Sequence, residues 1–199
     1  MLDRTIPYYN LLMRCDEVAT EKWTLPYDHR IRFYEPGDAP NWARVERAVG
    51  DFPDKVQAQV EAYFLGRYDL EALSRRCLFA VNGEGSVVGT CTAWRDPKGL
   101  EDVASLHWLA VEPGSQGRGI GRALVDETMR LFERLGEMPV YLHTQPWSHR
   151  AIGLYLDVGF YALKTESFGD YENQFEDAAR TLRAHLDART YEKLMDTAR

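Results

Sequence analysis

The spacing of apolar residues predicts a strand followed by a long helix in the middle of the chain. Residues 106–111 form an apolar run rich in large side chains, which is typical of a buried strand. From residue 120 onward, apolar side chains recur every three or four positions, which predicts one face of a helix that ends near Gly136 and Pro139. A turn with four glycines joins the two elements: Gly114, Gly117, Gly119 and Gly121.

Similar patterns predict further elements on both sides of this segment. The other expected strands are 31–34, Cys77–Val81, 87–94 and Val140–Thr144. The other expected helices are Ala39–Val49, one opened by Pro53, Leu70–Arg76, a short helix after Pro146, and an amphipathic helical segment within 171–199. A hairpin at 82–85 implies an antiparallel pair and a loop is expected at 96–99, whereas the crossover through the long helix implies a parallel pair. The sheet is therefore expected to be mixed.

The first 28 residues carry several aromatic side chains but show little regular period. We expect this arm to pack on the domain or on a partner. It is either an ordinary surface arm or a lid over a substrate, and the sequence favours the surface arm.

The glycine-rich turn predicts a binding site for a phosphate group. Glycines adopt positive φ and leave backbone N–H groups uncovered, and the helix start adds its positive dipole end to the charges of Arg118 and Arg122. Two common phosphate loops do not fit. The dinucleotide fingerprint counted from Gly117 meets Arg122 where a third glycine is required, and a P-loop counted from Gly114 meets Ile120 where lysine is required.

Two motifs resemble the signatures of the GCN5-related N-acetyltransferase (GNAT) superfamily. Residues 116–121 read Gln-Gly-Arg-Gly-Ile-Gly and fit its acyl-CoA pyrophosphate loop, Gln/Arg-x-x-Gly-x-Gly/Ala. Residues 148–160 fit its second signature, Asn-x-x-Ala-x-x-Leu-Tyr-x-x-x-Gly-Phe, except that Ser148 stands where the family often has asparagine. The matching positions are Ala151, Leu154, Tyr155, Gly159 and Phe160. The resemblance covers roughly residues 30–167.

The resemblance implies an α/β fold of the α+β type, with a mixed, mostly antiparallel sheet whose central parallel pair splays in a V, flanked by helices. It implies an acyltransferase domain (30–168) and leaves both ends unexplained, which the residue patterns assign to an N-terminal arm (1–29) and a C-terminal helical extension (169–199) packed on the domain or a partner subunit. It also implies acetyl-CoA as co-substrate. The residues that it implies for binding acetyl-CoA are Leu109, Ala110, Val111, Gln116, Gly117, Arg118, Gly119, Ile120, Gly121, Arg122, Ser148 and Ala151; for Ser148, capping of the short helix is the favoured alternative.

Two catalytic residues follow from the same resemblance. Tyr155 is expected to act as general acid at the departing sulfur, because a phenol with an ordinary pKa of about 10 stays protonated at neutral pH. His107 is the first candidate for the base, since histidine exchanges protons near neutrality and period-two alternation places it on the same side as Leu109 and Val111. The alternatives for the base are His143, Glu46 and water. The candidate acceptor contacts are Glu46, Trp94 and His143, with Asp51 and Tyr63 in addition. For Glu46, Asp51 and Tyr63, the stronger expectation is that they are solvated helix residues.

Composition narrows the function. The net charge of −7 disfavours a nucleic-acid partner, no apolar run is long enough to span a membrane, and three cysteines without metal spacing predict no metal site and a cytoplasmic protein. We therefore expect an acetyl-CoA-dependent N-acetyltransferase whose acceptor is a primary amine, favoured as a small molecule over a protein. The amine is expected to attack the thioester directly in a ternary complex. A non-catalytic acyl-CoA sensor and a protein or peptide N-acetyltransferase are the alternatives, and a homodimer stays open.

Overall fold

The computed structural model describes residues 2–18 and 23–199. Its strands are β1 (Leu11–Cys15), β2 (Arg30–Phe33), β3 (Cys77–Val81), β4 (Val87–Lys98), β5 (Glu101–Val111), β6 (Val140–Thr144) and β7 (Tyr161–Ala162). Its helices are α1 (Ala39–Val49), α2 (Gln57–Arg67), α3 (Leu70–Arg76), α4 (Ile120–Leu135), α5 (His149–Val158), α6 (Phe175–Leu182) and α7 (Ala188–Thr197), with short 3-10 turns at Pro113–Ser115 and Pro146–Ser148.

The strands form one seven-stranded sheet in the order β2-β3-β4-β5-β6-β1-β7. The pairs β2–β3, β3–β4, β1–β6 and β1–β7 are antiparallel, and β5 and β6 are parallel at Ala104–Val140 and Ser105–Tyr141. The expected mixed, mostly antiparallel sheet with a parallel pair and flanking helices is confirmed.

The described residues divide into two compact units, and β4, β5 and α4 contribute to both. The first unit holds residues 23–93 and 107–131, and the second holds 2–18, 94–106 and 132–199. The expected division into 1–29, 30–168 and 169–199 stays a prediction. None of the described helices has the length and apolar character needed to cross a membrane.

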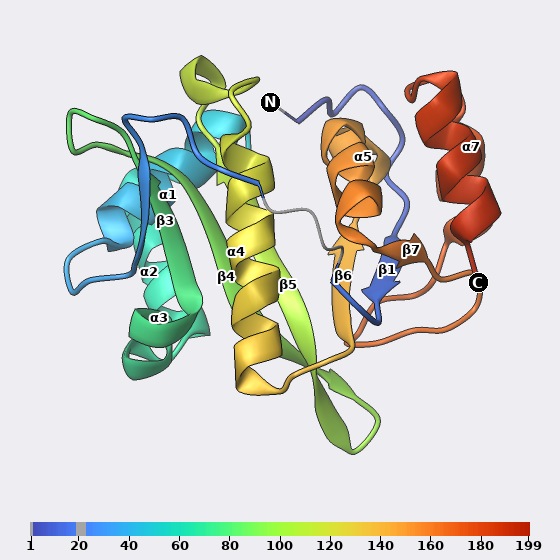
Figure 1. The fold of residues 1–199 in the computed structure, drawn as a ribbon, viewed down its shortest axis with the longest axis horizontal. Coiled ribbons are helices and arrows are strands. Elements are labelled where there is room, and N and C mark those ends of the chain that lie inside the picture. Colours follow the sequence, from blue (N-terminus) through green and yellow to red (C-terminus); the bar gives the residue numbers. More distant parts are fainter. Residues whose placement is uncertain (1, 19–22) are drawn as a thin grey trace. The chain divides into compact units, whose positions relative to one another are not determined.

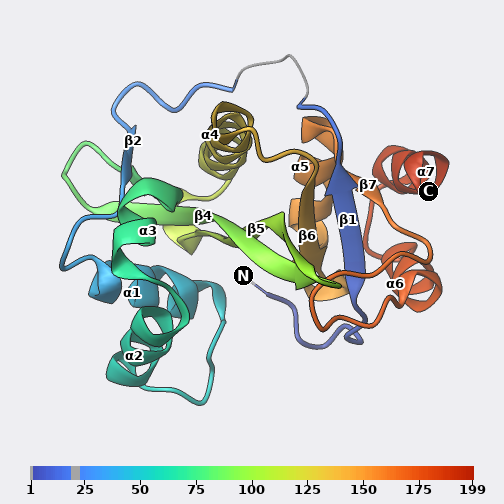
Figure 2. The same cartoon turned by 90° about the horizontal axis from the view of Figure 1, so that it is seen from below.

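In the first unit, helices cover both faces of the sheet (Figures 1 and 2). The helices α1, α2 and α3 lie on one face, and α4 lies on the other. Gly89 of β4 allows α4 to come close, because a Cβ at this position would meet Leu124 and the Ala110 carbonyl at 3.0 Å. Helix α2 begins at Gln57 rather than near Pro53, so that part of the expectation is wrong.

The second unit is built around β1, which pairs with both β6 and β7. Its apolar side chains at Leu11, Leu12 and Met13 are fully buried, so the expectation of an irregular surface arm or lid is wrong for this segment. The expected loop at 96–99 is also wrong at its start, because β4 continues to Lys98. The C-terminal segment forms two helices: α6 packs against β1, and α7 packs against α5 and β7.

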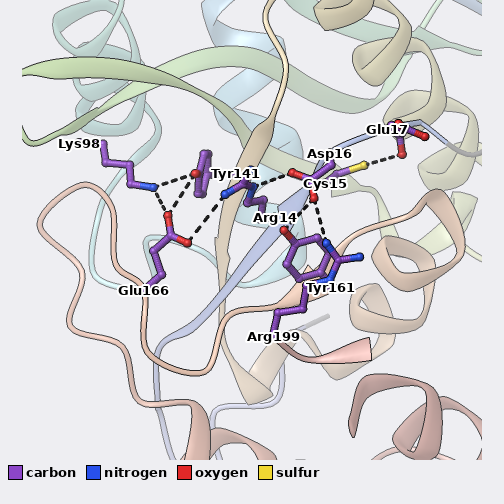
Figure 3. A network of polar contacts seen from close by, with 9 residues as sticks. All are labelled: Arg14, Cys15, Asp16, Glu17, Lys98, Tyr141, Tyr161, Glu166 and Arg199. Carbon is purple, nitrogen blue, oxygen red and sulfur yellow. Dashed lines mark hydrogen bonds and ion pairs between the residues drawn. The ribbon is translucent and has the colours of Figure 1, made fainter. Parts of the chain in front are cut away.

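A polar network fixes the later segments of the second unit to β1 (Figure 3). Asp16, directly after β1, accepts hydrogen bonds from the Tyr161 hydroxyl at 2.9 Å and from the Arg199 guanidinium at 3.1 Å. Lys98 donates to the Tyr141 hydroxyl at 2.7 Å and forms an ion pair with Glu166. These contacts join β4 to β6, and they join β7 and the C-terminal residue to the end of β1; Arg14 of β1 connects the two sets through its ion pair with Glu166 at 3.8 Å.

Candidate functional site

The glycine-rich loop lies in the first unit, between the end of β5 and the start of α4. Gly117 and Gly119 have φ of +77° and +82°, a conformation that favours glycine, and a Cβ at either position would meet no atom within 4 Å. Ala123 N–H donates to the Gly119 carbonyl at 3.0 Å, so the helix starts here and its first N–H groups have no intrahelical acceptor. The open loop and these N–H groups fit a diphosphate, which needs several donors on one side.

Gln116 has a role in this loop that the motif does not reveal. Its side-chain amide donates to the Val111 carbonyl at 2.8 Å. This bond ties the loop to the end of β5 and occupies one of the strand carbonyls that the resemblance assigns to acetyl-CoA. The geometry therefore favours a loop-positioning role for the Gln116 side chain.

The two arginines of the loop bring positive charge to it. The Arg122 guanidinium lies 4.1 Å from the centre of the Trp23 ring, and it stacks there as a cation on an aromatic face. Arg118 helps to lower the pKa of Asp28, after the larger effect of the His29 hydrogen bond. Trp23 was missed by the motif analysis because it lies far from the loop in sequence.

Strand β5 changes direction just before the loop. Trp108 has a φ of 51°, which is strained for a residue with a side chain. As a result the consecutive residues His107 and Trp108 both contact α2 and its C-cap: His107 Nδ1 lies 2.9 Å from the Tyr68 hydroxyl, and the Trp108 ring contacts Tyr63. The period-two alternation expected for this strand is therefore broken, and Tyr68 is a partner of His107 that the sequence did not reveal.

Glu46 is buried, so the solvated-surface interpretation is wrong for it. The residue is only 1% exposed, and burial raises the pKa of its carboxyl well above the usual range, with a further contribution from Asp51. Trp42 lies one turn earlier on α1 and is fully buried as well. The spacing of Trp42 and Glu46, four residues apart on one helix, is the signal that could have predicted this pair.

The remaining candidate residues lie in the second unit. Tyr155 on α5 is 7% exposed and meets the Phe160 ring edge-on at 6.0 Å, and Ala151 lies one turn earlier. The His143 ring stacks on Tyr171 at 4.0 Å, with Nε2 2.9 Å from the Asn10 amide oxygen.

Two further candidate site residues, Trp94 and Ser148, also lie in the second unit. Trp94 is half-buried on β4. Ser148 precedes α5 but makes no side-chain capping bond, so the expected capping role is wrong; its hydroxyl instead accepts a hydrogen bond from the Gln145 amide at 3.0 Å. Within the described ranges, no group of three His, Cys, Asp or Glu side chains is placed to hold a metal ion.

Replacing Glu46 by glutamine is expected to stabilise the fold in a pH-dependent way. Because the pKa of the folded carboxyl is raised, its contribution to stability is fully present below pH ~4.3 and is lost as pH rises through the folded pKa. Above that pKa, Glu46→Gln should raise the free energy of unfolding by about 1–3 kcal/mol. Urea unfolding between pH 5 and 9 measures it, with the exposed Glu71→Gln as control. A pH-independent difference would contradict the prediction.

The sheet, its parallel pair and the glycine-rich loop ahead of α4 together define an acyltransferase architecture. The chain belongs to the acetyltransferase (GNAT) family, whose model matches residues 41–160. The family resemblance drawn from residues 116–121 and 148–160 is thereby confirmed.

Individual relatives agree with this membership. The mycothiol acetyltransferase of Acidothermus cellulolyticus is 29% identical over 153 residues, which cover 69% of this chain and 46% of that protein. The mycothiol acetyltransferase of Saccharomonospora viridis is 28% identical over 166 residues, which cover 78% of this chain and 54% of that protein. The chain thus spans about half the length of the curated relatives it matches. A GCN5-related N-acetyltransferase from Sphaerobacter thermophilus has the same fold, with a TM-score of 0.56, 23% identity, and coverage of 78% of this chain and 50% of that one.

Proposed function

We propose that the protein transfers an acetyl group from acetyl-CoA to a primary amine of a small molecule. The observation that carries the proposal is the open glycine loop at the start of α4, which offers uncovered N–H groups and two arginines to a diphosphate. Family membership supports acetyl transfer as the reaction. The matched relatives are named for mycothiol, a small molecule, and this supports a small acceptor rather than a protein.

The proposed reaction involves two proton movements. His107, whose Nδ1 lies 2.9 Å from the Tyr68 hydroxyl, accepts the amine proton directly or through water. Tyr155 donates its hydroxyl proton to the departing sulfur. Acetyl-CoA supplies the thioester, and residues 109–111 and 116–122 with Ser148 and Ala151 hold it. Glu46, Trp94 and His143 are the proposed acceptor contacts.

Direct attack by the amine is favoured over an acyl-enzyme. Burial raises the pKa of Cys15, Cys77 and Cys91 each to about 12, so these three thiols stay protonated and are poor nucleophiles. The proposed reaction therefore takes place with both substrates bound.

The test is release of free thiol from acetyl-CoA in the presence of a panel of primary amines and short peptides. Turnover with small amines, together with a product whose mass is increased by one acetyl group, supports the proposal. Thiol release only with peptides would favour a protein acetyltransferase. Tight CoA binding without turnover across the panel would favour a sensor. The cytoplasmic location and the homodimer stay predictions that this assay does not address.

A further inference from the structure

An aromatic cluster lies on the helical face of the first unit, and none of its residues is among those proposed to bind acetyl-CoA. It consists of Trp42, Phe52, Tyr63 and Trp108, and Trp108 lies at its centre. The Trp108 ring stacks on Phe52 with centroids 5.3 Å apart and meets Trp42 and Tyr63 edge-on at 5.4 and 5.9 Å. Four rings from α1, the loop after it, α2 and β5 therefore converge on one place.

The cluster extends from the surface to the core of this unit. Tyr63 is 38% exposed, Phe52 and Trp108 are half-buried, and Trp42 is fully buried. Here the outer rings stay accessible to a molecule that arrives from solvent.

Two buried polar atoms at the inner end of the cluster lack hydrogen-bond partners. Glu46 Oε1 and Trp42 Nε1 are both inaccessible to solvent, and neither forms a hydrogen bond. Buried polar groups are nearly always paired, so an acceptor and a donor left unpaired one helical turn apart call for an explanation. A positively charged group on a bound molecule would pair with Glu46 Oε1, and a hydroxyl on the same molecule would accept from Trp42 Nε1.

The charges around the cluster select the sign of that group. Glu46 and Asp51 are both acidic, and the Asp51 N–H donates to the Glu46 carbonyl at 3.1 Å, so the two residues are adjacent in space. Burial raises the pKa of Tyr63 most, Arg67 lowers it, and Asp51 and Glu46 raise it further. Aromatic ring faces carry partial negative charge and attract cations. The site therefore favours a cation and disfavours carboxylates and phosphates.

We propose that the aromatic cluster and Glu46 bind an organic ammonium ion that carries no carboxylate or phosphate, and that amines of this class are the acceptors. The left-handed φ of Phe52 and Trp108, 53° and 51°, supports a functional role, because such strain is retained where it holds side chains in place. The assignment as acceptor rests on the proposed function, whereas cation binding does not.

Choline tests cation binding separately from acetyl transfer. Its quaternary nitrogen carries no proton to lose, so the nitrogen cannot be acetylated. Its uncharged isostere, 3,3-dimethylbutan-1-ol, has the same shape and serves as the matched ligand. Titration of the full chain, followed by tryptophan fluorescence and calorimetry, is expected to give at least tenfold tighter binding of choline. Equal affinities of the two ligands would overturn the proposal.

Variants locate the site. Glu46→Gln and Phe52→Leu are each expected to weaken choline binding about tenfold, and Glu46→Gln should fold at least as well as the wild type. Glu71→Gln, an exposed acid with the same charge change, and Tyr27→Leu, an exposed aromatic outside the cluster, should leave binding unchanged. Unchanged binding in both cluster variants would place the cation elsewhere and contradict the proposal.

The pH dependence adds a readout that packing alone would not give. Choline affinity should rise with pH as the Glu46 carboxyl ionises, and this rise should vanish in Glu46→Gln. The groups that interact with Glu46 are Asp51, Tyr63 of α2, Cys77 of β3 and Cys91 of β4, and Arg67 acts on Tyr63. A rise with pH that persists in Glu46→Gln would contradict the role of this carboxyl.

The two proposals fail in distinguishable ways. Choline binding without acetyl transfer to any amine would uphold the cation site and overturn the proposed function. Turnover of amines that choline does not inhibit, together with weak choline binding, would overturn the cation site alone.

Discussion

Gly119→Val is expected to abolish the protection that CoA gives against thermal unfolding. At a CoA concentration 100 times its Kd, the wild type should gain about 2.7 kcal/mol, which corresponds to a rise in Tm of about 5–10 °C. Gly119 has a φ of +82°, and a β-branched residue is strongly strained there. The valine side chain would also project into the open side of the loop, where the diphosphate is proposed to bind.

The measurement is the shift in Tm with CoA, compared with each variant's own Tm without CoA, so that a less stable fold does not obscure it. Gly114→Ala is the matched control. Its Cβ would also meet nothing within 4 Å, but its φ lies outside the left-handed region, so the protection by CoA should persist. If CoA protects Gly119→Val as well as it protects the wild type, the diphosphate does not bind at this loop.

The sequence predicted the loop and α4 well because their determinants are local. Positive φ requires glycine, and the apolar period of 120–135 is long enough to identify a helix without tertiary information. The start of α4 at Ile120 agrees with the expected start near Gly119. The same reasoning predicted α1 and α3. Helix α1 ends at a local signal, Gly50 at its C-cap, and α3 begins at one, Asp69 at its N-cap.

Strand β1 was not predicted because its determinants are not local. Residues 11–15 are buried nearly throughout, so they lack the alternation that identifies a half-exposed strand, and they pair with strands more than 120 residues away. The amphipathic pattern of 171–199 was read correctly as helical, but the break between α6 and α7 depends on how each helix packs. Such breaks are set by tertiary contacts rather than by propensity.

In the candidate site, too, the features with local sequence determinants were predicted and those that depend on tertiary contacts were not. The phosphate loop was visible as a motif, whereas the aromatic cluster joins residues from four separate elements. The bend at Trp108 could not be predicted, since a non-glycine residue with positive φ contradicts its own local preference and is held by its neighbours. The burial of Glu46 was equally hidden, because a single charged residue on an amphipathic helix is usually solvated.

Tyr155→Phe is expected to lower kcat about 100-fold or more while leaving CoA affinity unchanged. Phenylalanine keeps the ring that packs edge-on against Phe160, so the fold of α5 and the binding of CoA should be preserved. Only the hydroxyl is lost, and general acid catalysis of thiolate departure is worth 10²–10⁴-fold.

Tyr161→Phe distinguishes this role from the general effect of removing a buried hydroxyl. Tyr161 lies in the same unit and is equally buried, and its hydroxyl donates to Asp16 at 2.9 Å. Its loss should reduce stability by about 1 kcal/mol but leave kcat unchanged. If Tyr155→Phe also keeps the wild-type kcat, Tyr155 is a packing residue, and the proton for the leaving group comes from elsewhere, such as water. The loop and the cation site would then remain as separate proposals, because neither depends on the identity of the acid.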